Sequence, residues 1–132
     1  VQGNATVIGA DTVVACDGKI LGKPQDREDA IRMLTMLSGR KHSVYTGVAL
    51  CRHVGGTLVT DSFYEETKVE FYPMSQQEIE SYVDSGDPMD KAGAYGIQSG
   101  AAIFVKAIEG DYNTVVGLPV SAVYQRLKAF EA

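Results

Sequence analysis

Two glycine-containing turn signals, each lying between β-rich segments, constrain the fold of this chain more than any other feature. The first is the pair Asp17-Gly18, which follows a strand-like segment at residues 6–15. The second is the sequence HVGG, which joins residues 42–52 to residues 57–72. Asp-Gly and Gly-Gly pairs favour the tight turns that connect antiparallel strands. The sequence therefore predicts a sheet built around two antiparallel hairpins.

Three amphipathic segments are predicted to form helices that flank the sheet. Asp26 is a plausible N-cap for the first helix, and Pro119 suits the first turn of the last. Ser75 is followed three residues later by Glu78, which is the capping-box pattern for a middle helix. Apolar residues recur at helical spacing after each start: Ala30, Met33, Leu34, Leu37; Ile79, Tyr82, Val83; Val123, Leu127, Phe130.

The glycine-rich stretch DPMDKAGAYGIQSGA, residues 87–101, predicts a polar loop. The segments AIFVKAI and YNTVVGL that follow have strand composition and predict another hairpin. Residues 1–132 contain no linker or repeat and are expected to form a single domain. The predicted fold class is α/β, with a mixed, mostly antiparallel twisted sheet and flanking helices.

The net charge and the length of the apolar runs limit the kinds of partner that this chain can bind. The chain of 132 residues has a formal net charge of -5, which argues against a broad nucleic-acid-binding face but allows a local basic pocket for a small anion. No apolar run approaches the roughly 20 residues that cross a bilayer, so we expect no membrane partner and a cytoplasmic location. Cys16 and Cys51 lie in strand-like segments and are expected to be buried thiols.

Two residues in the segment VIGADTVVAC are unusual for an apolar strand. Asp11 and Thr12 lie among β-branched residues. Burying an ionised carboxylate without a partner costs several kcal/mol, so we expect Asp11 to face a cleft or a cation. Lys23 lies across the predicted Asp17-Gly18 turn and can face the same cleft. The alternative is a cross-strand ion pair on a solvated sheet face.

The loop MDKAGAYGIQ contains a second group of candidate ligand-binding residues. Lys91 offers a positive charge for phosphate, and Gln98 offers both a donor and an acceptor for a base edge. Glycines between them allow the backbone to approach a ligand closely. An ordinary solvated loop is the alternative. Arg40 is a further phosphate-binding candidate, although a cation at a helix C-terminus also interacts favourably with the helix dipole.

Six blocks of the sequence resemble the Maf family of nucleotide pyrophosphatases, in the same order and over nearly the whole chain. They are GADTVV, LGKP, MLSGRKHSVYTGVAL, EETKV, PMDKAGAYGIQ and IEGDYNTVVGLP. The resemblance implies a fold similar to inosine-triphosphate pyrophosphatases, with a deep cleft between two lobes. It also implies hydrolysis of a nucleoside triphosphate to the monophosphate and pyrophosphate, assisted by Mg²⁺ or Mn²⁺, and a homodimer.

The family pattern assigns roles to five residues of this sequence. It implies that Asp11 is the general base and can bind the metal, and that Lys23 and Lys91 contact phosphate. Thr12 and Gln98 match the branch that acts on dTTP and UTP, whereas the 7-methyl-GTP branch usually differs at both positions. The alternative functions are a non-catalytic, nucleotide-binding regulator of septum formation in cell division and a 7-methyl-GTP-type pyrophosphatase.

The sequence departs from the family pattern in two places. Family members normally begin with a strand and a loop that carries a serine and paired arginines, followed by an acidic residue, and nothing here matches them. We therefore expect a Maf-like domain that is N-terminally incomplete relative to the family. The stretch after Gln98 reads SGAA, where the family usually has a Gly-x-Gly run.

Overall fold

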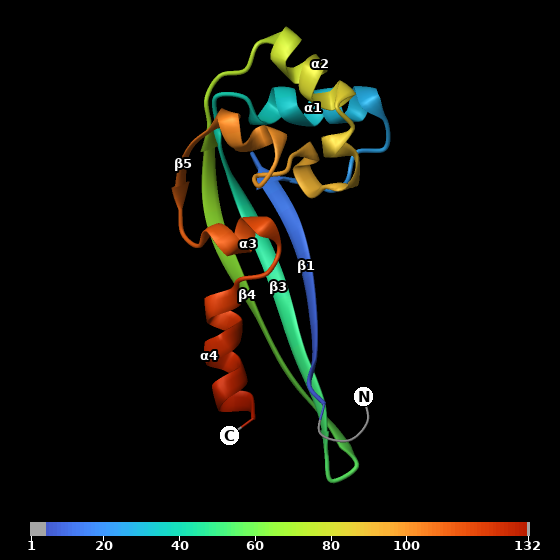
Figure 1. Ribbon diagram of the computed structural model, residues 1–132, viewed down its shortest axis with the longest axis vertical. Helices are drawn as coiled ribbons and strands as arrows, with labels where there is room; N and C mark the ends of the chain where they lie inside the picture. The colour runs from blue at the N-terminus through green and yellow to red at the C-terminus, as the bar shows by residue number, and fades with distance from the viewer. Residues whose placement is uncertain (1–4, 132) are drawn as a thin grey trace.

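A computed structural model describes residues 5–131 as a long twisted sheet with helices packed against it (Figure 1). The five strands have the order β2-β1-β3-β4-β5, and each of the four neighbouring pairs is antiparallel. Their bounds are β1 Val7–Cys16, β2 Lys19–Leu21, β3 Lys41–Val54, β4 Thr57–Phe71 and β5 Val105–Glu109. The predicted α/β class with a mostly antiparallel sheet is confirmed.

Both predicted hairpins are present. Asp17 and Gly18 have φ of 51° and 76°, and Gly55 and Gly56 have φ of 58° and 82°. Two successive residues with positive φ make a tight turn whose twist matches that of the flanking strands. The first turn joins β1 to the short β2, and the second joins β3 to β4, the longest strands of the sheet. These turns fix the antiparallel register that places the site residues.

The helices are α1 Arg27–Leu37, α2 Gln76–Asp84, α3 Tyr112–Val116 and α4 Val120–Phe130. Three of the helices, α1, α2 and α4, begin at the residues that the sequence predicts, whereas α3 was not predicted. The Asp26 side chain accepts a hydrogen bond from the Asp29 backbone N–H, which caps α1. Ser75 and Glu78 form the predicted capping box at the start of α2. Three short 3-10 turns separate α2 from β5: η1 Asp87–Asp90, η2 Ala92–Ala94 and η3 Gly100–Phe104.

One face of the sheet carries the core. Residues alternate along β3, so that every second side chain from His42 to Leu50 is buried. Helices α1 and α2 and the 3-10 turns cover one end of this face, and α3 and α4 lie farther along it, before the β3–β4 turn (Figure 1). Val14, Val44 and Phe71 from the sheet pack in a core with apolar residues of α1 and α2. No helix in the described part of the chain is long and apolar enough to cross a membrane.

The predicted third hairpin is wrong. Its first segment is divided between η3 and β5, and its second segment forms helix α3 instead of a strand. The Asp111 side chain accepts hydrogen bonds from the backbone N–H and the hydroxyl of Thr114, so a capped helical turn replaces the strand.

Burial at the start of β1 and at Cys51 is less complete than their apolar composition suggests. Val7 and Ile8 are 49% and 42% exposed. Val7 shares with Asp11 the face of β1 that points away from the helices, because side chains alternate along a strand. Cys51 is only partly buried, whereas Cys16 is buried, and both thiols are free. The apolar composition of the strand around Asp11 therefore does not mean that all of this strand is buried.

Candidate functional site

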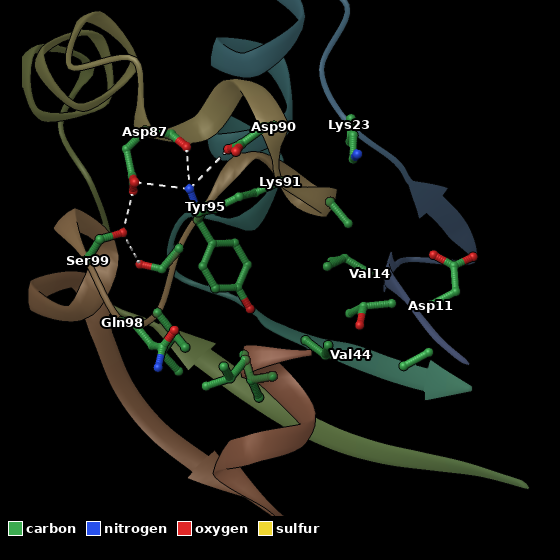
Figure 2. A pocket seen from close by; sticks show the side chains of 17 residues that line it. Asp11, Val14, Lys23, Val44, Asp87, Asp90, Lys91, Tyr95, Gln98 and Ser99 are labelled. Atoms are coloured by element: carbon green, nitrogen blue, oxygen red, sulfur yellow. Dashed lines mark hydrogen bonds and ion pairs between the residues drawn. The ribbon is translucent and has the colours of Figure 1, made fainter. Parts of the chain in front are cut away.

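A pocket of about 480 Å³ lies between β1, the loop that follows α2, and α3 (Figure 2). It is open on one side and large enough for a small-molecule ligand. The sequence-predicted residues Asp11, Thr12, Lys23, Lys91 and Gln98 all line it. The other lining residues are Ala10, Val14, Val44, Asp87, Asp90, Ala92, Tyr95, Gly96, Ile97, Ser99, Val115 and Val116.

Asp11 is exposed at the rim of this pocket, which agrees with the expectation that it faces a cleft. It pairs with Gly47 on β3, where a Cβ atom would meet nothing within 4 Å. The space beside the carboxylate is therefore open. No ion pair of Asp11 is present among the described residues, so the alternative, a cross-strand ion pair with Lys23, does not form.

Thr12 faces the opposite side of β1 from Asp11, toward the helices. Its Oγ1 lies 2.9 Å from Oγ1 of Thr46, which is directly opposite on β3. The Thr46 hydroxyl donates to the backbone carbonyl of Thr114 in α3 at 2.7 Å. This chain of hydroxyls holds α3 against the strand, and α3 in turn places Val115 and Val116 in the wall of the pocket.

Lys23 lies in the loop after β2, on the other side of the pocket from Gln98 (Figure 2). In the β1–β2 hairpin Val14 pairs with Leu21, and continuing this register carries Lys23 to the level of Thr12. The side chain is exposed, and no ion pair of it is present in residues 5–131. Its ammonium group is therefore available to an anionic ligand.

Lys91 is held by two neighbouring acids. Its Nζ donates to the backbone carbonyl of Asp87 at 2.9 Å, to Asp87 Oδ1 at 3.1 Å and to Asp90 Oδ1 at 3.1 Å. Burial alone would lower the pKa of the Lys91 ammonium, but the two carboxylates outweigh burial and raise it. Lys91 is thus a fixed cation, in an orientation that its acidic neighbours set (Figure 2).

Asp87 organises the whole loop. Its Oδ2 accepts from the Tyr82 hydroxyl at 2.5 Å and from the Ser99 hydroxyl at 2.7 Å. The Tyr82 oxygen in turn accepts from the backbone N–H of Gly96 at 2.9 Å. Burial alone would raise the pKa of Asp87, but hydrogen bonds from Tyr82, Ser99 and Lys91 hold it below its usual value. An ionised Asp87 therefore ties both ends of the loop together.

Tyr95 forms the inner wall of the pocket between the loop and the sheet. Its hydroxyl lies 2.7 Å from Nε2 of His42, and the two rings meet edge to face. Phe71 packs against both rings. Burial lowers the pKa of His42 to about 4, so this imidazole is neutral at pH 7 and supports the wall without adding charge.

Of the two remaining predicted residues, Gln98 lies at the pocket and Arg40 does not. Gln98 is exposed and lines the pocket. Arg40 pairs with Asp17 at the β1–β2 turn and is not among the residues that line the pocket. The structure therefore gives no support to grouping Arg40 with the other phosphate-binding candidates, and its role stays a prediction.

Sequence reasoning missed the supporting residues of the site. Tyr82 was assigned to the apolar stripe of its helix, although its hydroxyl carries the loop contacts. Asp87 lies four residues before Lys91, a spacing that signals an ion pair. Thr46 and Tyr95 gave no local signal, because their partners are distant in the sequence.

Comparison with known proteins agrees with the earlier resemblance. A family model described as Maf-like protein matches residues 1–130. A protein of Agathobacter rectalis is 58% identical over 123 residues, 92% of this chain and 60% of the relative. A protein of Carboxydothermus hydrogenoformans is 57% identical over 122 residues, which are 92% of this chain and 64% of the relative. A Bacillus pumilus protein is 50% identical over 126 residues, 96% of this chain and 65% of the relative.

All three relatives are named dTTP/UTP pyrophosphatase. The chain spans less than two thirds of the length of each of them. Because the family model extends over almost every residue, and because identity is at or above 50% over more than nine tenths of the sequence, this chain belongs to the Maf family.

Proposed function

We propose that the full-length protein hydrolyses pyrimidine nucleoside triphosphates, dTTP or UTP, to the monophosphate and pyrophosphate. One observation carries the proposal: a single pocket gathers an exposed carboxylate, two lysines and two residues suited to reading a base. The names of the relatives support the same reaction. In this proposal the described residues act as one Maf-like domain.

Asp11 is the proposed general base. A water oxygen attacks the α-phosphorus, Asp11 accepts a proton from that water, and the bond from the α-phosphorus to its bridging oxygen breaks. Pyrophosphate then leaves with the electron pair of that bond. Proton removal by a positioned carboxylate typically contributes about 10²–10⁴-fold to the rate. The open space beside Gly47 leaves room for the water next to the carboxylate.

The donor set fits a divalent cation that is shared with the substrate. Asp11 supplies hard carboxylate oxygens, and the described residues contain no group of three or more His, Cys, Asp or Glu that could hold a metal alone. Mg²⁺ is commonly bound by one or two carboxylates together with substrate phosphates. When bound, Mg²⁺ or Mn²⁺ would neutralise phosphate charge and make the attacking water more acidic.

Lys23 and Lys91 are the proposed phosphate contacts. Lys23 is available as it stands, whereas Lys91 already donates to Asp87 and Asp90. The Asp90 side chain is 82% exposed, and ion pairs of this kind are worth less than about 1 kcal/mol. A phosphate oxygen can therefore replace Asp90 at Lys91 at little cost, while Asp87 continues to orient the ammonium group.

Thr12 and Gln98 are the proposed base-reading residues. Both line the pocket, and both carry groups that hydrogen-bond to the edge of a pyrimidine. A site that satisfies one base with buried polar groups penalises a base that lacks the complementary donor or acceptor. We therefore expect dTTP and UTP to be preferred over CTP, purine triphosphates and 7-methyl-GTP.

The test is pyrophosphate and orthophosphate release by the full-length protein from this panel of nucleotides, with Mg²⁺ or Mn²⁺. Asp11→Asn should lower kcat for dTTP by about 100-fold or more, because it removes the proton acceptor. Asp17→Asn is the matched control, since it neutralises an exposed acid of the same hairpin outside the pocket. Undiminished turnover by Asp11→Asn refutes the assigned role, and nucleotide binding without any pyrophosphate release indicates a non-catalytic nucleotide-binding protein.

A further inference from the structure

The hydroxyl chain beneath α3 has a direction that the hydrogen-bonding groups determine. A carbonyl oxygen only accepts, so Thr46 donates its single hydroxyl proton to the carbonyl of Thr114. In the 2.9 Å contact between the two threonine hydroxyls, Thr12 must therefore be the donor. The proton of Thr12 is directed away from the pocket, and Thr12 offers a ligand only lone pairs.

These lone pairs stay accessible because residue 117 is glycine. A Cβ atom at Gly117 would lie 3.8 Å from Oγ1 of Thr12 and would cover part of it. Gly117 has φ of +130°, a conformation that side-chain-bearing residues rarely adopt. Thr12 also lines the pocket. A ligand in the pocket can thus reach an oxygen that accepts but does not donate.

Such an oxygen distinguishes the two kinds of pyrimidine where it meets ring nitrogen N3. Uracil and thymine carry a hydrogen on ring nitrogen N3, whereas N3 of cytosine is an acceptor. Gln98 cannot make this distinction alone, because its amide presents a donor and an acceptor and can turn to suit either base. No described hydrogen bond fixes the orientation of that amide. The Thr12 hydroxyl cannot adapt in this way while it donates its proton to Oγ1 of Thr46.

We infer, on the basis of the proposed function, that Thr46 is a specificity-determining residue. It touches no substrate atom, because it is completely buried. By donating to Thr114 it makes Thr12 an obligate acceptor toward the pocket, which favours the N3–H of uracil or thymine and disfavours cytosine. The discrimination between UTP and CTP thus depends on a buried residue of the neighbouring strand.

The experiment compares kcat/KM for UTP and CTP in the full-length protein. Thr46→Val keeps the side-chain shape but frees the Thr12 hydroxyl to turn and donate to cytosine N3. The ratio of UTP to CTP activity should fall by about tenfold or more, which corresponds to one mismatched hydrogen bond. Thr46→Ser retains the hydroxyl and should restore the ratio to within about threefold of wild type.

Thr67→Val is the matched control. The Thr67 hydroxyl is equally buried and donates to the carbonyl of Asp111 at 2.8 Å, so it anchors the start of α3 from β4 without contacting Thr12. This variant loosens α3 but should leave the UTP to CTP ratio unchanged. An unchanged ratio in Thr46→Val, or an equal fall in both variants, overturns the inference.

A second variant, Thr12→Val, and a binding measurement with UMP and CMP test the same inference. If Thr46→Val does not fold, Thr12→Val replaces it, since loss of the accepting oxygen must also abolish the preference, and an unchanged ratio there overturns the inference. Absence of pyrophosphate release by the wild-type protein refutes the proposed function instead. Calorimetric binding of UMP and CMP to the same variants then tests Thr46 without turnover: the UMP preference must fall in Thr46→Val and persist in Thr67→Val, and any other pattern overturns the inference.

Discussion

Acidification below pH 6.5 should destabilise this protein through His42. The His42 side chain is only 3% exposed, and burial lowers its pKa from 6.5 to about 4. Its Nε2 lies beside the Tyr95 hydroxyl, and its Nδ1 is buried without a hydrogen-bond partner among the described residues. The surroundings therefore offer no compensation for a positive charge, and the imidazole must be neutral in the folded protein.

The sign of the effect follows from proton linkage. Between pH 6.5 and about 4 the unfolded chain binds a proton at His42 that the folded protein does not bind, so stability falls as the pH falls. Above pH 6.5 the neutral imidazole makes its full contribution to the free energy of unfolding. A pKa difference of this size corresponds to a loss of about 3 kcal/mol once the pH reaches 4.

The assay is urea unfolding of wild type and His42→Phe at pH 7 and at pH 4. Phe keeps an aromatic ring between Phe71 and Tyr95 but removes the titrating group. Only the wild type carries the titrating imidazole, so the difference in unfolding free energy between the two proteins should change by about 3 kcal/mol with pH. The same substitution at the partly exposed His53 is the matched control. A difference that does not depend on pH, or an NMR titration of His42 near 6.5, refutes the reasoning.

Two other substitutions test the packing around the pocket. Tyr82→Phe should lower the unfolding free energy by about 1–3 kcal/mol, measured in urea, because it leaves the buried N–H of Gly96 without its acceptor; an unchanged free energy would show that this contact is dispensable. Gly93→Ala should lower it by more than about 2 kcal/mol, since φ is +73° and the new Cβ would lie 2.8 Å from a methyl carbon of Val14. Gly22→Ala, where a Cβ meets nothing within 4 Å, is the matched control and should change it by less than about 0.5 kcal/mol.

The sequence predicted the elements whose signals are local. Asp17-Gly18 identified the β1–β2 turn because both positions need positive φ, and Ser75 with Glu78 identified the start of α2 because capping involves residues three positions apart. The segment around Thr114 was predicted to be a strand because β-branched residues favour strands. Its helix instead depends on a cap from Asp111 and on a hydroxyl of β3, which is remote in the sequence.

For the site, the sequence identified individual residues but not the contacts that orient them. Asp11 and Lys91 were recognisable because a charged group in an apolar strand or a glycine-rich loop is conspicuous by itself. Their geometry was not predictable, since Lys91 is oriented by Asp87, and Asp87 is held by Tyr82 from another helix. Such contacts form only when α2 packs beside the loop, and no periodicity in the sequence reports them.

The shortness of β2 explains how neighbouring residues of one strand can serve one ligand. Asp11 and Thr12 project to opposite faces of β1, because side chains alternate along a strand. Strand β2 pairs with β1 only from Val14 to Cys16, so among the described strands β1 is an edge at Asp11. A ligand lying across that edge can reach the carboxylate on one face and the Thr12 hydroxyl on the other. Extending β2 along the edge would separate these two groups, which makes the early end of β2 a functional feature of the proposed site.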